Sequence, residues 1–307
     1  MAKNMKNLNI HKVLPILAAP IAGYTDFSFR RILRECGADL VYTEMVSATA
    51  LFHGSEKTKG LLRMHGNTAV QLFGKNPEHF VFAIKSGLLD SFSEININMG
   101  CPAKKIVKNG EGSALMKNLP LAREIIRACV GATNKPVTVK MRIGYLYSDG
   151  NVALELAKIC EEEGVSKIIV HGRWQEQGYS GKADWTEIAK VKRAVGIPVF
   201  ANGDVKCLES YSRCIEETGC DGVMIARGLI GSPWVISLSE KPPAEEIRAL
   251  IKRHIAYARE EHGDSLAIRE MKKHLLFYAD SLKVAKREKT KLAVANSFEE
   301  IASLLAL

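Results

Sequence analysis

The fold is decided by one strand–helix–strand stretch at residues 137–171, which reads VTVKMRIGYLYSDGNVALELAKICEEEGVSKIIVH. The strings VTVK and KIIV are almost continuously apolar, as is typical of strands buried on both faces of a parallel sheet. Residues 152–163 between them keep the spacing of an amphipathic helix. The order of strand, helix and strand predicts a right-handed parallel βαβ unit.

The same unit recurs on both sides of this stretch. Strand starts recur about every 25 to 30 residues, apart from one gap of about 43 after the fourth. The expected strands are 16–19, 40–43, 69–73, 94–98, 137–141, 167–170, 198–201 and 222–226, and the expected helices are 27–36, 77–89, 121–130, 152–163, 185–195 and 208–218. Eight such units in about 240 residues predict a (β/α)8 TIM barrel. The alternative is a doubly wound open sheet, which is disfavoured because no strand precedes GxGxxG or GxxxxGK[ST].

After Trp234 the pattern becomes purely helical. Lys241-Pro242-Pro243 is typical of a linker or a helix start. Helical spacing continues over 244–262, ends at Gly263, and resumes over 266–282 and towards residue 305. The sequence therefore predicts a barrel domain at 1–240 and a small all-helical domain at 241–307.

The chain carries a surplus of positive charge. Its 43 Lys and Arg against 34 Asp and Glu give a formal charge of +9, which favours an anionic partner without identifying it. Residues 269–291 concentrate eight basic groups among three acidic ones, with Phe277 and Tyr278 between them. Such a run either grips RNA or is an ordinary solvated helix face. The eight are Arg269, Lys272, Lys273, Lys283, Lys286, Arg287, Lys289 and Lys291.

The seven cysteines and the apolar runs indicate the cellular compartment of the protein. None belongs to a CxxC pair, which argues against a zinc knuckle or a redox dithiol. Residues 13–23 faintly resemble a signal peptide, but Pro15 and Pro20 interrupt them, and no run approaches the ~18 apolar residues of a membrane span. We expect a soluble, monomeric, cytoplasmic protein that binds neither a membrane nor a metal.

Polar side chains stand where seven of the eight expected strands end. In a TIM barrel these ends form the face that carries the chemistry. Singly, Gln71 could cap a strand, His171 could be a core histidine, Asp204 could cap a helix, and Lys140 could form a Schiff base. Together they predict a ligand site at the barrel mouth. The residues are Glu44, Gln71, Asn98, Lys140 with Arg142, His171, Asn202 with Asp204, and Arg227.

Eight short motifs carry a resemblance to a known family. They are APIAGYTDFSFR (19–30), EMVSA (44–48), QLFG (71–74), NMGCPAKKIVKNGEGSALM (98–116), VKMR (139–142), VHGR (170–173), ANGD (201–204) and ARGLIGSPW (226–234). In order and spacing, and with its helical tail, the chain resembles the tRNA-dihydrouridine synthases. The resemblance implies an FMN-dependent oxidoreductase that reduces uridine to 5,6-dihydrouridine in tRNA, using NADPH or NADH.

The resemblance also implies an FMN site. Gln71 can both donate to and accept from the flavin's pyrimidine edge, and Lys140 would place positive charge near N1 and O2. Backbone amides and the Arg227 guanidinium would hold the phosphate. The implied contacts are Pro20, Ile21 and Ala22 against the ring, Gln71, Lys140 and His171 at its polar edge, and Asn202, Gly203, Asp204, Ala226 and Arg227 at the phosphate.

Cys101 is the expected catalytic residue. Hydride from flavin N5 would reach uracil C6, and the thiol would protonate C5 from the other face, since an ordinary thiol pKa of about 8.5 leaves it protonated near neutrality. Asn98 would pair with the uracil imide edge, and Arg142 with a uracil carbonyl or a phosphate. The other six cysteines are expected mostly in the core. Two alternatives stay open: a flavin barrel that reduces a free pyrimidine, and an RNA-binding protein with a vestigial flavin site.

Overall fold

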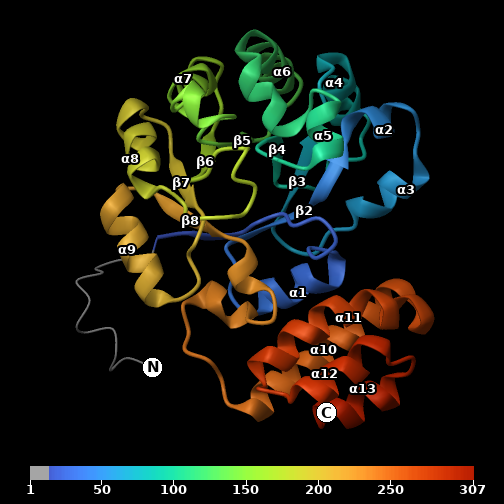
Figure 1. The fold of residues 1–307 in the computed structure, drawn as a ribbon. Coiled ribbons are helices and arrows are strands. Elements are labelled where there is room, and N and C mark those ends of the chain that lie inside the picture. Colours follow the sequence, from blue (N-terminus) through green and yellow to red (C-terminus); the bar gives the residue numbers. More distant parts are fainter. Residues whose placement is uncertain (1–13) are drawn as a thin grey trace.

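A closed barrel of eight parallel strands forms the upper part of the molecule (Figure 1). The structure is a computed structural model that describes residues 14–307. The strands pair in chain order, and β8 returns to β1 with Val223 opposite Ile16. The predicted TIM barrel is confirmed, and the open sheet is excluded. The strands are β1 Ile16–Ala18, β2 Leu40–Ser47, β3 Thr68–Phe73, β4 Glu94–Met99, β5 Val137–Arg142, β6 Lys167–His171, β7 Val199–Asn202 and β8 Gly222–Ile225.

Helices cover the outside of the barrel, close to the predicted positions. The predicted helix at 121–130 starts earlier, at Leu119, because Pro120 suits a first turn and the Asn118 side chain caps the Leu121 N–H. The helices are α1 Phe27–Glu35, α2 Ala48–Phe52, α3 Glu56–Lys59, α4 Pro77–Lys85, α5 Lys104–Lys108, α6 Leu119–Gly131, α7 Ala153–Glu162, α8 Trp185–Ala194 and α9 Leu208–Thr218.

The second strand departs most from the prediction. It was expected to end at Thr43, before Glu44, but β2 continues to Ser47. Its pairing with β3 shifts register between Tyr42 and Met45, so Glu44 lies at an irregularity inside the strand. There the Glu44 carboxylate accepts the Gly23 N–H at 2.6 Å, which ties β2 to the turn after β1.

Two separate cores follow from the alternation of side chains along each strand. The larger one lies between the strands and the helices. The smaller one fills the barrel interior and contains Leu17, Leu40, Tyr42, Ile169, Phe200 and Met224. At Gly222 a Cβ would lie 2.4 Å from the Phe200 ring, so only glycine fits beside this inner core.

Every inward-facing side chain of β4 and β5 is polar. At the amino-terminal end, buried Glu94 accepts hydrogen bonds from the Tyr42 hydroxyl at 2.8 Å and the Thr138 hydroxyl at 2.6 Å, and it forms an ion pair with Lys167. These bonds satisfy a carboxylate that would be costly to bury alone. Glu94 on β4 is therefore bonded to side chains of three other strands at the barrel floor: β2, β5 and β6.

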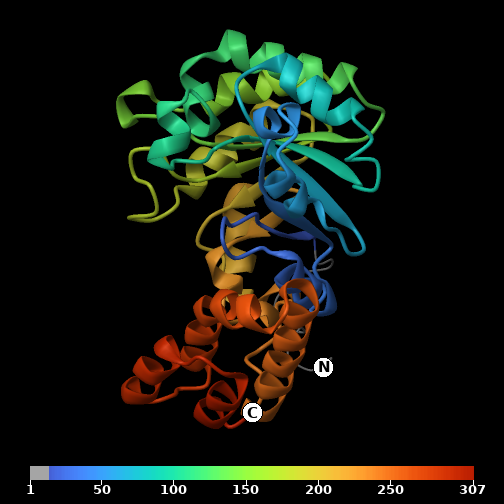
Figure 2. The ribbon, with the colours of Figure 1, turned by 90° about the vertical axis from the view of Figure 1, so that its right-hand side faces the viewer.

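The helical tail lies against α1, below the barrel (Figures 1 and 2). Its helices are α10 Ala244–His262, α11 Asp264–Ser281, α12 Lys286–Val294 and α13 Phe298–Leu305. Ion pairs join it to α1, with Arg31 to Glu260 at 2.7 Å and Glu35 to Arg253 at 3.2 Å. The last barrel-side turn ends at Ser237, so the predicted domain boundary after residue 240 falls in the connection before α10.

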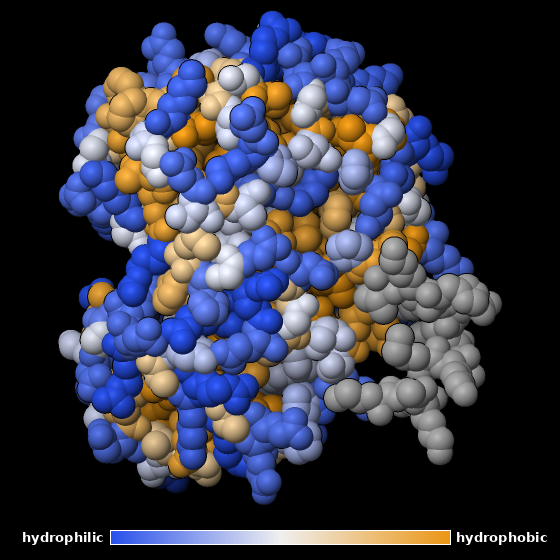
Figure 3. All heavy atoms as spheres, turned by 180° about the vertical axis from the view of Figure 1, so that it is seen from behind, coloured by the Kyte–Doolittle hydropathy of each residue, from blue (hydrophilic) through white to orange (hydrophobic). Residues whose placement is uncertain are grey.

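Two further features are the polarity of the surface and the state of the cysteines. Seen from behind, mostly hydrophilic side chains cover the lower half of the molecule (Figure 3). Within residues 14–307, no helix has the length and apolarity needed to cross a membrane. All seven cysteines are free thiols. Cys129, Cys160, Cys214 and Cys220 are buried as expected, whereas Cys36 is half-buried and Cys207 is exposed.

Candidate active site

A cavity of about 710 Å³ opens at the carboxyl ends of the strands. Residues from every strand or the turn after it line its wall, and Phe277 of α11 joins them. The structure brings fourteen of the predicted site residues into this one cavity, while their individual roles stay predictions. They are Pro20, Ile21, Ala22, Gln71, Asn98, Cys101, Lys140, Arg142, His171, Asn202, Gly203, Asp204, Ala226 and Arg227. Glu44, which was also predicted at the barrel mouth, does not line the cavity.

Asn98 at the end of β4 organises the turn that carries Cys101. Its Oδ1 accepts the N–H of Gly100 at 3.1 Å and of Cys101 at 2.9 Å. Its Nδ2 donates to Gln71 Oε1 at 2.8 Å and to Met45 Sδ at 3.1 Å. These four bonds use the full capacity of an amide side chain. Asn98 would have to release one of them to pair with a uracil ring, and two of them fix the turn that carries Cys101.

A chain of side-chain hydrogen bonds continues from Asn98 down the barrel. Gln71 Nε2 donates to Asn96 Oδ1 at 2.7 Å, and Asn96 Nδ2 donates to Thr138 Oγ1 at 2.7 Å. Thr138 in turn donates to Glu94 on the floor. Gln71 keeps one donor and one acceptor position beyond these bonds, and its side chain lines the cavity.

Cys101 is held from both sides and remains a thiol. Its carbonyl accepts the Ser113 N–H at 3.1 Å and the Ser113 hydroxyl at 2.8 Å. Gly112 makes this return of the loop possible, because at its φ of +60° a Cβ would lie 2.9 Å from the Cys101 carbonyl oxygen. Burial raises the pKa of Cys101, outweighing the Ala103 N–H and the nearby cations, so the sulfur carries its proton at neutral pH.

Lys140 on β5 is half-buried, and its environment lowers the pKa of its amine. Its Nζ donates to Asn202 Oδ1 at 2.9 Å, and Asn202 Nδ2 donates to the Met224 carbonyl at 2.7 Å. Burial, with a smaller effect from Arg142, lowers the pKa of Lys140 to about 7. Asn202 therefore orients Lys140, and one N–H of its Nδ2 remains beyond these two bonds. An anionic ligand beside Lys140 would restore its full charge.

Arg142, two residues further along β5, braces two loops. Its Nε donates to the Gly100 carbonyl at 2.8 Å and its Nη1 to the Trp174 carbonyl at 2.9 Å. The side chain is 1% exposed, and burial lowers its pKa to about 10, so it keeps its charge near neutrality. Three of its five N–H donors remain beyond these two bonds.

Arg173 completes the cationic wall. Its Nη2 donates to both carboxylate oxygens of Asp204, at 2.8 and 2.9 Å, and its Nη1 lies 3.2 Å from His171 Nε2. A guanidinium can only donate, so His171 accepts at Nε2 and carries its proton at Nδ1. Burial first, then Lys140 and the surrounding arginines, lowers the pKa of His171 well below its usual value, so the ring is neutral.

The turn after β7 approaches this wall closely. Gly203, at φ +119°, has no room for a Cβ, which would lie 2.7 Å from Ala183. Asp204 follows in a left-handed conformation, φ 59°. Burial alone would raise the pKa of Asp204, but the Ala183 N–H at 2.6 Å and Arg173 outweigh it and lower that pKa. Asp204 is therefore neutralised by Arg173 and does not repel an anion.

The charges around the cavity favour an anionic ligand. Three arginines and two lysines, Lys140 and Lys206, line the wall, and Asp204 is the single carboxylate among the lining residues of the described chain. Among these cations Arg227 has 54% of its side chain exposed, and Lys206 is exposed as well. A guanidinium next to glycine-rich turns is well suited to a phosphate.

Three aromatic wall residues were not predicted as site residues: Tyr24, Tyr179 and Phe277. Tyr179 is 59% exposed, and its ring centre lies 5.6 Å from the Arg142 guanidinium and 5.3 Å from that of Arg227. Tyr179 belongs to the irregular segment between β6 and α8. The site was predicted from polar residues at strand ends, which say nothing about such a segment. Phe277 was predicted as part of the basic run, but it lies on α11 against the cavity. Its neighbour Tyr278 is fully buried and bonded to His254, so its predicted place among RNA-facing residues is wrong.

The basic run is partly neutralised. Lys273, Lys289 and Lys291 form ion pairs with Glu270 at 2.7 Å, Asp280 at 2.5 Å and Glu288 at 3.0 Å. Arg269 lies 3.6 Å from Glu270. The charge left for a polyanion belongs to the four members without an ion pair among residues 14–307, which are Lys272, Lys283, Lys286 and Arg287.

Comparison with known proteins identifies the family. The family model described as "Dihydrouridine synthase (Dus)" matches residues 16–305. The chain belongs to the dihydrouridine synthase family. A "Probable tRNA-dihydrouridine synthase" of Rickettsia conorii is 39% identical over 288 residues, covering 89% of this chain and 87% of the relative. A "tRNA-dihydrouridine synthase B" of Pseudomonas putida is 36% identical over 277 residues, covering 86% and 82%. The resemblance read from the motifs is confirmed.

Solved structures support the fold alone. A 2-naphthoyl-CoA reductase complex is similar at a TM-score of 0.57 with 10% identity, covering 72% of this chain and 49% of that one. A Rhizobium histamine dehydrogenase gives a TM-score of 0.52 with 14% identity, covering 79% and 48%. The chain thus spans about half of either longer enzyme.

The low pKa of Lys140 predicts a pH-dependent stability. Its folded pKa of about 7 lies below its usual 10.5, so the unfolded chain binds more protons between these values and stability rises with pH there. In cofactor-free protein, the wild type should gain ~2 kcal/mol or more over Lys140→Met between pH 7 and pH 10, measured by urea unfolding. Exposed Lys158→Met is the control and should follow the wild type. Parallel pH profiles for wild type and Lys140→Met would contradict the buried charge.

Proposed function

We propose that this protein reduces uridine to 5,6-dihydrouridine in tRNA, with FMN in the barrel cavity and NADPH or NADH as the electron donor. One observation carries the proposal: a cationic cavity and a protonated thiol share one barrel mouth in a chain of the dihydrouridine synthase family. The names of its curated relatives support tRNA as the substrate.

The residues of the cavity suit a flavin mononucleotide. The volume of about 710 Å³ is in the range of cofactor pockets. Small or apolar Pro20, Ile21 and Ala22 offer a surface for a flat ring, and Gln71 keeps a free donor and a free acceptor for its edge. Bound FMN would supply hydride transfer.

The remaining polar groups would stabilise the two negatively charged parts of FMN, which are the ring and the phosphate. Lys140, oriented by Asn202, and the neutral His171, with a proton at Nδ1, would stabilise negative charge at the ring. Gly203, Asp204 and Ala226 would contribute backbone groups to the phosphate, together with the Arg227 side chain. At Gly228 a Cβ would lie 3.0 Å from the Val205 carbonyl oxygen, so the two phosphate-side turns pack tightly.

Proton transfer at the substrate would belong to Cys101. The raised thiol pKa keeps the proton on sulfur, as a general acid requires. Asn98 would act through its bonds to the Gly100 and Cys101 N–H groups, which fix the sulfur's position. Arg142 would use its free N–H donors on a uracil carbonyl or a phosphate, while its other bonds keep the Gly100 loop in place.

Replacing Cys101 should separate the two half-reactions. Cys101→Ala should keep FMN, seen as yellow colour, and should be reduced by NADPH at the wild-type rate. It should lose dihydrouridine formation on unmodified tRNA by about 100-fold or more, because only the proton donor is missing. Anaerobic stopped-flow absorbance measures the first step, and nucleoside mass spectrometry measures the second.

The matched control is Cys207→Ser, which changes an exposed thiol and should leave both steps intact. Normal tRNA turnover by Cys101→Ala would remove Cys101 from the mechanism. Wild-type protein that stays colourless after incubation with FMN would refute the cofactor.

Charge reversal of the basic residues without an ion pair tests whether the substrate is tRNA or a free pyrimidine. The triple variant Lys283→Glu, Lys286→Glu and Arg287→Glu should raise KM for tRNA by about 10-fold or more and flatten its salt dependence. NADPH oxidation by the bound flavin should stay unchanged.

A matched charge reversal on the barrel exterior, Lys85→Glu with Lys158→Glu, should have little effect on KM. These lysines are exposed on α4 and α7. Equal kinetics for both variants would assign the tail no part in holding tRNA. Turnover of free uridine as fast as tRNA would favour the free-pyrimidine alternative.

A further inference from the structure

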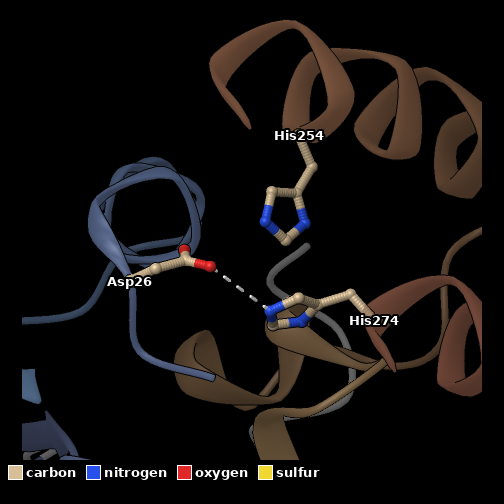
Figure 4. Close-up of side chains that lie close together, drawn as sticks. All are labelled: Asp26, His254 and His274. Carbon is tan, nitrogen blue, oxygen red and sulfur yellow. Dashed lines mark ion pairs between the residues drawn. The ribbon is translucent and has the colours of Figure 1, made fainter. Parts of the chain in front are cut away.

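Three potential metal ligands meet where the barrel packs on the tail (Figure 4). Asp26 immediately precedes α1, His254 lies on α10 and His274 lies on α11. One ligand atom from each lies within 4.8 Å of the others, and Asp26 Oδ2 is 3.9 Å from His274 Nε2. The cluster is separate from the cavity, since none of its members lines that wall.

The two histidines are buried with unsatisfied nitrogens. Both are 0% exposed. His254 Nε2 and both ring nitrogens of His274 lack a hydrogen-bond partner in the part of the chain that the structure describes. Phe29 packs on both rings, with centroids 5.4 Å from His254 and 4.7 Å from His274. Buried nitrogens left unpaired in such surroundings are costly, which indicates a bound group.

Other contacts leave one free ligand atom on Asp26 and one on His254. Asp26 Oδ1 caps α1 by accepting the Phe29 N–H and the Ser28 hydroxyl, both at 2.8 Å, so Oδ2 is left. His254 Nδ1 lies 3.1 Å from the Tyr278 hydroxyl, so Nε2 is left. A second-shell bond of this kind orients a metal-binding imidazole.

We propose that Asp26, His254 and His274 bind a divalent transition-metal ion, Zn²⁺ by the chemistry of its ligands, and that the ion fastens the tail to the barrel. Two imidazoles and one carboxylate are a usual set for Zn²⁺, with water in the fourth position. Bonds of about 2.0–2.1 Å require the three atoms to draw somewhat closer, which side-chain rotation achieves. The proposal departs from the sequence expectation of no metal.

The surrounding charges are balanced enough to admit a cation. Arg30 and Lys273 place positive charge near the cluster, and Glu261 places negative charge there beside Asp26. Glu261 also accepts the Ser28 N–H at 2.9 Å, so it belongs to the same contact between α1 and α10.

Packed side chains connect the proposed metal site to the cavity. Phe277 follows His274 by one helical turn on α11 and lines the cavity wall. The Tyr24 ring packs edge-on against both, at 5.4 Å from His274 and 6.1 Å from Phe277. A metal that fixes His274 therefore also fixes the one tail residue that reaches the cavity.

Metal binding by the full-length protein tests the proposal. After treatment with EDTA and gel filtration, the wild type should take up about one equivalent of Zn²⁺, measured by plasma mass spectrometry after dialysis. Its Tm should rise by about 5 °C when free Zn²⁺ is ~100-fold above Kd. His254→Gln, His274→Gln and Asp26→Asn should each weaken binding at least about 10-fold, the loss typical of even outer-shell partners.

The control His65→Gln changes an exposed histidine and should bind Zn²⁺ like the wild type. If a histidine variant fails to fold, Asp26→Asn decides, because asparagine caps a helix as well as aspartate and only the ligating charge is lost. Wild-type protein without Zn²⁺ uptake and without a Tm shift would overturn the proposal. Undiminished uptake by Asp26→Asn would also overturn it, by placing the ion on surface histidines such as His53 and His79.

Discussion

The hydrogen-bonded chain that runs through the barrel from Glu94 to Cys101 is the constraint on which the site depends. Glu94, Asn96 and Asn98 alternate along β4, so all three point inward. Each bonds to a neighbouring strand, through Thr138 or Gln71. The floor of the barrel is thereby linked to the turn that holds the thiol. Asn98 uses all four of its hydrogen-bonding positions, and Gln71 and Asn96 are each bonded through both the oxygen and the nitrogen of the amide. These amides therefore cannot rotate independently, and Cys101 is held before any ligand arrives.

Much of this site was predictable because parallel barrels bring all strand ends to one face. Once the spacing predicts eight βα units, polar residues such as Gln71, Lys140 and His171 must converge, whatever their separation in the chain. The individual roles depend on contacts that spacing does not encode. Asn98 and Asn202 look like ligand-binding amides in sequence, but both are engaged with protein partners. Glu44 looked like a strand end because a register shift inside β2 is invisible in the sequence.

In the helical tail, even less of the side-chain arrangement could be predicted from the sequence. Its helices were predicted from apolar spacing, but the spacing did not predict what each helix face contacts. Tyr278 is buried against His254 whereas Phe277, its neighbour, reaches the cavity, and one helical step of about 100° separates them. The cluster of Asp26 with two tail histidines joins residues more than two hundred positions apart, so no local motif marks it. The tail is therefore part of the active-site wall, as well as a basic surface beside it.

The most direct test of the central claim is a map of dihydrouridine in tRNA from cells that carry or lack this protein. The account predicts that at least one uridine position is fully unmodified in the deletion strain. It also predicts that wild-type protein restores the modification and Cys101→Ala does not. An unchanged dihydrouridine pattern in the deletion strain, with no loss at any position, would contradict the assignment of tRNA as the substrate of this barrel.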